Sequence, residues 1–244
     1  MKSLCYALLC LAPLIATASN DISKVNSSIH VEAGQSVGDV ESVNGSIHVD
    51  DAATTENVNT VNGSISIGNQ ATVGKINTVN GGIGVGEQSK AGSIETVNGT
   101  LKVGAGSQIA NSVSAVNGSI SLAKGVTVAG KLQNVNGKMT LEAAHVGAGI
   151  ETTNGDIDIR AGSRVQGGIV VEKPHGNWFG SKRKPPTIVI GPDAIVEGEL
   201  RFEQPVTLYV SNRAKTGAIS GATAIPFSGD APPSLEQAHE SVER

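Results

Sequence analysis

Two histidines near the start of the chain have the residue type and spacing of a metal site. His30 and His48 each stand between Ile and Val, in residues 29–31 and 47–49. If both segments are strands of one parallel sheet, the side chains lie about 4.8 Å apart on one face. Imidazoles at this spacing can share a transition-metal ion. No third ligand is evident at Ser66 or Gly84, the next positions of the series, so we expect an exposed histidine pair without a metal.

Asp156 and Asp158 have the spacing of a pair of carboxylates on one face. They flank Ile157, so both point outward if this segment is a strand with a buried isoleucine. Paired carboxylates can hydrolyse a glycosidic bond. Sugar subsites, however, usually offer flat rings for stacking, and residues 26–171 contain no aromatic residue. We therefore expect a solvated charged face, no catalytic residue and no cofactor.

Residues 172–186 combine the only tryptophan of the chain with several basic side chains, although the formal net charge is −4. Cations beside aromatic rings suit an anionic surface, such as lipid headgroups, an acidic polysaccharide or an acidic patch of a protein. The alternative is a loop that folds back and only covers the edge of the domain. The predicted binding loop consists of Lys173, His175, Trp178, Phe179, Lys182, Arg183 and Lys184.

The elements that carry these residues belong to one repeat, whose most regular unit is Val-Asn-Gly-Ser-Ile, as in residues 61–65. Its asparagine returns at steps of 18 or 19 residues. A fixed period of this length predicts a solenoid, in which each repeat is one coil stacked on the next. The stacked amides are expected to form a structural ladder. Its members are Asn26, Asn44, Asn62, Asn80, Asn98, Asn117, Asn136 and Asn154.

A finer period divides each coil into three sides of six residues. Every sixth position is small or aliphatic, which predicts a triangular coil of about 18 residues with these side chains inside. A second inward set lies between them, at Ile65, Ala71 and Ile76. Glycines 68, 74, 86 and 104 are expected at corners with positive φ. The six-residue series is Val61, Ile67, Val73, Val79, Val85, Ala91, Val97, Val103 and Ile109.

Asn-Gly between alternating hydrophobic residues also favours an antiparallel meander, because it is a strong hairpin signal. A meander gives no reason to restore the same residue type at every coil. The sequence therefore predicts an all-β fold, a single-stranded parallel β-helix (β-solenoid), over residues 19–221 with an inserted loop at 172–186. Phe202 and Tyr209 are bulky enough to close its end, and residues 222–244 are predicted to be a flexible tail.

The first 18 residues are typical of a secretory signal peptide. Lys2 precedes an apolar run, and Ala16-Thr17-Ala18 resembles a cleavage site. Cleavage would remove both cysteines and, with Lys2, shift the formal charge from −4 to −5. An acidic mature chain argues against nucleic acid as a partner. We expect an exported protein, located in the periplasm, outside the cell or at the cell surface.

The Val-Asn-Gly-Ser-Ile units resemble the bacterial adhesin-like β-strand-repeat family, and residues 188–200 resemble the bactofilin-like, polymer-forming proteins. These resemblances imply a right-handed β-helix, a non-enzymatic structural or adhesive role, and self-association through the solenoid ends. Bactofilins are typically cytoplasmic or membrane-associated, and the signal peptide departs from that pattern.

The expected function is that of a scaffold or adhesin at the cell envelope. Its partner would be an envelope component, an anionic surface or a protein. A carbohydrate-active β-helix enzyme is the first alternative. A hexapeptide-repeat acyltransferase is the second, since the six-residue period suits it, although export away from cytoplasmic acyl-CoA argues against it.

Overall fold

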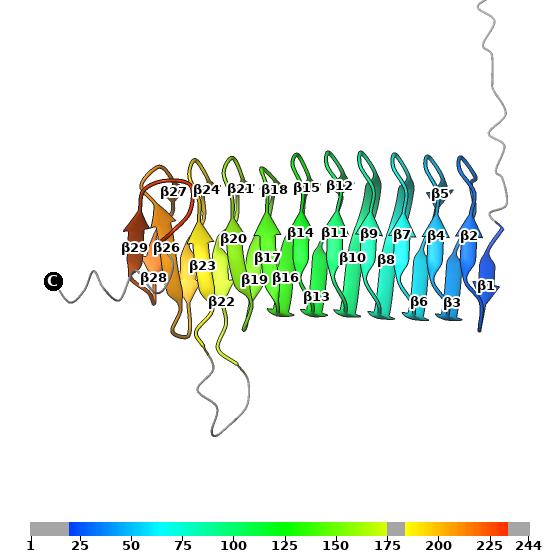
Figure 1. Cartoon of the computed structure of the whole chain (residues 1–244), viewed down its shortest axis with the longest axis horizontal. Helices are drawn as coiled ribbons and strands as arrows, with labels where there is room; N and C mark the ends of the chain where they lie inside the picture. The colour runs from blue at the N-terminus through cyan, green and yellow to red at the C-terminus, as the bar shows by residue number, and fades with distance from the viewer. Residues whose placement is uncertain (1–19, 175–183, 234–244) are drawn as a thin grey trace, which may run out of the picture.

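The computed structural model describes residues 20–174 and 184–233, which form a stack of parallel β-coils of about 11 turns (Figure 1). Each coil pairs with the next in parallel register, as Ile65 does with Ile83 and Ile83 with Leu101. The predicted β-solenoid is thereby confirmed, and the antiparallel meander is wrong. The predicted signal peptide lies outside the described residues. No helix in the described ranges has the length and apolar character needed to cross a bilayer.

The first side of the coils is a sheet of 11 strands. It comprises β2 (Ile29–Val31), β4 (Ile47–Val49), β7 (Ile65–Ile67), β9 (Ile83–Val85), β11 (Leu101–Val103), β14 (Ile120–Leu122), β17 (Lys138–Leu141), β20 (Asp156–Ile159), β23 (Thr187–Ile190), β26 (Thr207–Ser211) and β29 (Ala224–Phe227).

The second and third sides together make a sheet of 18 strands. The second side holds β5 (Thr54–Thr55), β12 (Gln108–Ile109), β15 (Thr127–Val128), β18 (His145–Val146), β21 (Arg164–Val165), β24 (Ile195–Val196) and β27 (Lys215–Thr216). The third side holds β1 (Ile22–Lys24), β3 (Val40–Asn44), β6 (Val58–Asn62), β13 (Val113–Asn117), β16 (Lys131–Asn136), β19 (Gly149–Thr152), β22 (Ile169–Val171), β25 (Leu200–Phe202) and β28 (Ile219–Ser220). In two coils these sides run together, as β8 (Thr72–Asn80) and β10 (Lys90–Asn98).

The core is a column of small and aliphatic side chains along the axis of the stack. The second inward set of the sequence is buried as predicted, since Ile65, Ala71 and Ile76 are all at most 1% exposed. Small and aliphatic side chains of one coil stack on those of the next, so one continuous core runs through the stack. A single coil could not bury this surface alone, and stability therefore belongs to the array.

One third of the predicted inward series points outward instead. Val61, Val79 and Val97 are 42%, 41% and 39% exposed. The alternation along the third side decides this, because Ile76 and Thr78 of β8 face inward and Val79, one residue later, must face solvent. The inward corner position is held by a threonine rather than by a valine.

The corner glycines are needed for space and not for positive φ. None of the glycines 68, 74, 86 and 104 has a positive φ, whereas Gln70 and Gln88, two residues after a corner glycine, have φ of 55°. At Gly68, a Cβ atom would approach the backbone nitrogen of Asp51 to 2.6 Å. The local backbone at Gly68 therefore leaves no room for a side chain, whereas the equivalent corner of other coils carries Asp50, Ala123 or Glu142.

The solenoid extends beyond the predicted end at residue 221. The strand β29 pairs with β26, so residues 224–227 belong to the stack rather than to a flexible tail. Pro226 fits there because β29 is an edge strand of the described sheet, and no further strand up to residue 233 requires its missing N–H. Phe202 is buried in the aliphatic core at this end, whereas Tyr209 and Phe227 are buried outside that core cluster. Residues 234–244 lie outside the described residues.

Candidate functional site

The eight predicted asparagines lie in one line along the corner between the third and the first side. Every member after Asn26 donates its Nδ2 amide to the Oδ1 atom of the asparagine one coil earlier, with distances from 2.8 to 3.1 Å. Most of these side chains are exposed, so the ladder runs along the surface of the stack. Because the amides bond to one another from coil to coil, the ladder acts mainly to hold neighbouring coils together.

The inserted loop leaves the solenoid at this same corner. Of its predicted binding residues, Lys173 and Lys184 are described and exposed. His175, Trp178, Phe179, Lys182 and Arg183 lie outside the described residues. The loop occupies the place that Asn154-Gly155 holds one coil earlier, because the strands before and after it, β22 and β23, pair in regular order with β19 and β20.

Gln204 ties the coils together beneath the insertion. Its Nε2 amide donates to the carbonyl oxygen of Glu172, at 3.0 Å, and also to the carbonyl oxygen of Thr153. These carbonyls belong to the two preceding coils. The side chain thus joins three successive coils beside the base of the loop. Its role was not evident in the sequence, because the contact spans 51 positions.

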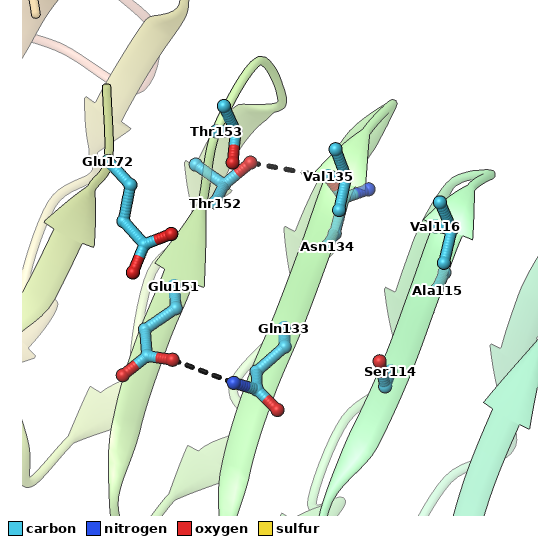
Figure 2. Close-up of a pocket in the computed structure, with 10 residues that line it drawn as sticks. All are labelled: Ser114, Ala115, Val116, Gln133, Asn134, Val135, Glu151, Thr152, Thr153 and Glu172. Atoms are coloured by element: carbon cyan, nitrogen blue, oxygen red, sulfur yellow. Dashed lines mark hydrogen bonds between the residues drawn. The ribbon is translucent and has the colours of Figure 1, made fainter. Parts of the chain in front are cut away.

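A shallow hollow lies beside the base of the loop, on the third side of the solenoid (Figure 2). Its volume is about 250 Å³, and it crosses β13, β16 and β19 up to Glu172. Polar atoms of Ser114, Gln133 and Glu151 face it. No motif in the sequence singled out these residues, because they are outward positions of ordinary coils.

The Glu151 carboxylate beside this hollow has two side-chain hydrogen-bond partners. It accepts hydrogen bonds from the Lys131 ammonium and from Gln133 Nε2, the latter at 2.7 Å. Partial burial raises the pKa of Glu151, but these hydrogen bonds and the charge of Lys131 outweigh it and bring the pKa below its ordinary value of 4.5. Glu151 is therefore ionised at neutral pH and suits a base or an ion-pair partner rather than an acid.

Asp156 and Asp158 point outward on either side of the buried Ile157, as expected. Asp158 contacts the ammonium of Lys138 at 2.8 Å and Nε of Arg160 at 3.4 Å. Asp156 accepts a hydrogen bond of 2.7 Å from the backbone N–H of Thr187. Each carboxylate therefore has partners within the solenoid.

His30 and His48 are neighbours on β2 and β4, in direct register. Their ring centroids lie 5.2 Å apart, close to the spacing inferred from the repeat. Asp50, which the sequence analysis did not single out, completes a cluster of three potential ligands. Ser66 and Gly84 continue the stack above His48, whereas Asp50 lies two residues after His48 along the same coil.

Searches against known protein families, characterised proteins and solved structures find no significant match to this chain.

Proposed function

We propose that this protein is an exported, non-enzymatic scaffold or adhesin of the cell envelope. The observation that carries this proposal is the unbroken stack itself. The coils pair from β1 to β29, their interior is filled with aliphatic side chains, and one surface ladder joins eight successive coils. Such a rod holds its surface residues at fixed, repeated positions. This suits a protein that spaces or presents contacts more than one that closes around a small substrate.

The partner-binding element in this proposal is the inserted loop of residues 172–186. The register of the coils continues across it, and Gln204 joins the coils beside its base. The stack therefore has no evident need of the loop for its own pairing. Basic and aromatic residues concentrated in one insertion of an acidic chain favour an anionic partner, either an envelope component or an acidic protein surface. Self-association through the solenoid ends is the second contact that we propose.

Replacement of residues 173–185 by a Gly-Ser linker tests the role of the loop. We expect the melting temperature to stay within about 2–4 °C of that of the native chain, which corresponds to about 1 kcal/mol. Retention on isolated cell envelopes and on anionic vesicles should be lost. A collapse of stability would instead identify the loop as a cover of the solenoid edge.

Sequencing of the exported chain should give an N-terminus at Ser19, and retention in the cytoplasm would contradict export.

A charge-matched pair of variants separates the loop from general electrostatics. One variant changes Lys173, Lys182, Arg183 and Lys184 to Ser. Its control changes four exposed lysines of the coils, Lys90, Lys102, Lys124 and Lys215, to Ser. Both lose the same charge, but only the loop variant should lose retention. Equal losses in the two variants would contradict a specific loop.

A carbohydrate-active enzyme is the second candidate, favoured by the presence of Glu151 and Glu172 at one hollow. The lining residues include no aromatic side chain, and Glu151 is engaged by Lys131 and Gln133. The double variant Glu151→Gln, Glu172→Gln should leave binding to the envelope unchanged. Polysaccharide cleavage by the native chain that this folded variant lacks would establish the enzyme instead.

A further inference from the structure

We propose that His30, His48 and Asp50 form a binding site for one divalent transition-metal ion on the outer face of β2 and β4. This site lies at the N-terminal end of the stack, away from the inserted loop. It is independent of the scaffold or adhesin function proposed above.

The three side chains converge because of the geometry of the coil. His30 and His48 are paired residues of adjacent parallel strands, so their rings stack at 5.2 Å with a tilt of 30°. Asp50 follows His48 by two residues, which brings its side chain back to the outer face. The Nε2 atoms of His30 and His48 lie 2.9 and 2.8 Å from the two carboxylate oxygens of Asp50. The ligand atoms of all three lie within 4.8 Å of one another.

Only a small rearrangement would admit a metal ion. Zinc binds imidazole nitrogen and carboxylate oxygen at about 2.0–2.2 Å, so neighbouring ligands in a tetrahedron lie about 3.4 Å apart. The present separations of 2.8 and 2.9 Å must therefore widen by roughly 0.5 Å. The side chains of His30 and His48 are 56% and 50% exposed, and that of Asp50 is 30% exposed, so all three have room to turn.

The donor set selects the class of ion. Two imidazoles and one carboxylate suit Zn²⁺, Cu²⁺ or Ni²⁺, whereas Mg²⁺ and Ca²⁺ prefer oxygen ligands. In the metal-free arrangement, each Nε2–H donates to an Asp50 oxygen. On binding, each Nε2 lone pair goes to the metal, so each imidazole coordinates as the tautomer that carries its proton on Nδ1. Water would complete the coordination from the solvent side.

Such an ion would join the first coils of the stack. It would connect β2 to β4 and to the turn that follows β4, at the end of the solenoid where β2 has no earlier neighbour among residues 20–174. Because the assembled site requires the folded coils, metal binding should raise the melting temperature of the protein.

Isothermal titration of the full chain with Zn²⁺ tests this site, and Mg²⁺ serves as the hard-ion control. The chain has three further histidines, so a His175→Gln, His239→Gln background removes the two that lie outside the described residues. His145→Gln is the matched control on β18, where the paired neighbours are Thr127 and Arg164. We expect one Zn²⁺ per chain in this background and no binding of Mg²⁺. His30→Gln, His48→Gln and Asp50→Asn should each weaken Zn²⁺ binding by about tenfold or more, and His145→Gln should not.

Electron paramagnetic resonance of the same background chain with Cu²⁺ gives a second readout, which counts the imidazole ligands directly. The spectrum should show coupling to two imidazole nitrogens, and it should fall to one nitrogen in His48→Gln. Zn²⁺ affinity that is unchanged in both His30→Gln and His48→Gln would overturn the proposal. Cu²⁺ coupled to fewer than two nitrogens in the chain with His30 and His48 intact would overturn it as well.

Discussion

At the scale of single residues, the inward polar side chains fix the corners of the coils. Thr60, Thr78 and Thr96 are at most 4% exposed. Each donates its hydroxyl to the carbonyl oxygen of a glycine in the preceding coil, at 2.9 to 3.1 Å. A valine in that place would leave the glycine carbonyl without this donor. The buried threonines therefore act as structural hydrogen-bond donors within an otherwise aliphatic core.

Thr55 offers a matched test of this role. It is buried like Thr78, but its Oγ1 has no hydrogen-bond partner among the described residues. Thr78→Val should cost about 1–3 kcal/mol, because it removes the hydrogen bond to Gly63. Thr55→Val should be neutral or stabilising by up to about 1 kcal/mol, since it releases an unsatisfied hydroxyl between Val37 and Val73, which hold the same place in the adjacent coils.

Chemical denaturation of the two valine variants measures the difference. The isosteric exchange keeps the side-chain shape, so packing changes are similar in both. If Thr55→Val destabilised the protein as much as Thr78→Val, the hydrogen bond to the glycine carbonyl would not be the reason for the buried threonines.

At the scale of the strand and its corner, close approach of successive turns decides which positions must be glycine. Gly63, Gly81 and Gly99 follow the ladder asparagines, and a Cβ atom at any of them would lie 1.9 to 2.2 Å from a carbonyl oxygen of the coil before. No L-residue fits there without moving the backbone. In the recurrent Asn-Gly pair, the asparagine therefore supplies the outward amide of the ladder, and the glycine is required because no side chain fits.

Gly81 and Gly84 form a matched pair for this prediction. A Cβ at Gly81 would meet the carbonyl oxygen of Gly63 at 2.0 Å, whereas a Cβ at Gly84 on β9 would meet nothing within 4 Å. Gly81→Ala should lower stability by about 2 kcal/mol or more through backbone displacement. Gly84→Ala should be neutral or slightly stabilising, because alanine restricts the unfolded chain more than glycine does. Equal melting temperatures of the two variants would contradict the steric explanation.

At the scale of the whole molecule, nearly all contacts join a coil to its immediate neighbours. Stability should then be close to a sum of coil and interface terms, and one complete coil should be removable. Deletion of residues 80–97 joins Val79 to Asn98, a residue that pairs with Asn80 in register. Every remaining side chain then keeps its inward or outward orientation.

We expect the chain without residues 80–97 to unfold in one cooperative transition, with a modest loss of stability. Deletion of residues 80–88 removes half a coil and breaks the register, so that inward and outward positions no longer stack. That variant should lose cooperative unfolding as followed by circular dichroism. Comparable stability of both deletions would show that the coils are not the units of the fold.

The amino-acid sequence by itself determined the parallel β-solenoid and its period. Identical residues at a fixed interval lie above one another only if the coils stack, and this placed Asn44 beside Asn62 and His30 beside His48. The same reasoning was wrong for Val61, Val79 and Val97. A six-residue period does not reveal where a corner falls, and the phase of the strand after the corner decides which side chains are buried.

Only the tertiary structure decided the contacts that do not follow the period. Asp50 meets His30 across 20 positions, and Gln204 meets Thr153 across 51. Whether residues so far apart in the sequence meet depends on how tightly each corner turns and on where the inserted loop leaves the stack. A polar side chain at an outward position can make such a contact without changing the hydrophobic repeat, so the repeat does not reveal it. For that reason the third ligand of the histidine pair, the tie beneath the loop and the hollow beside it appeared only when the coils were in place.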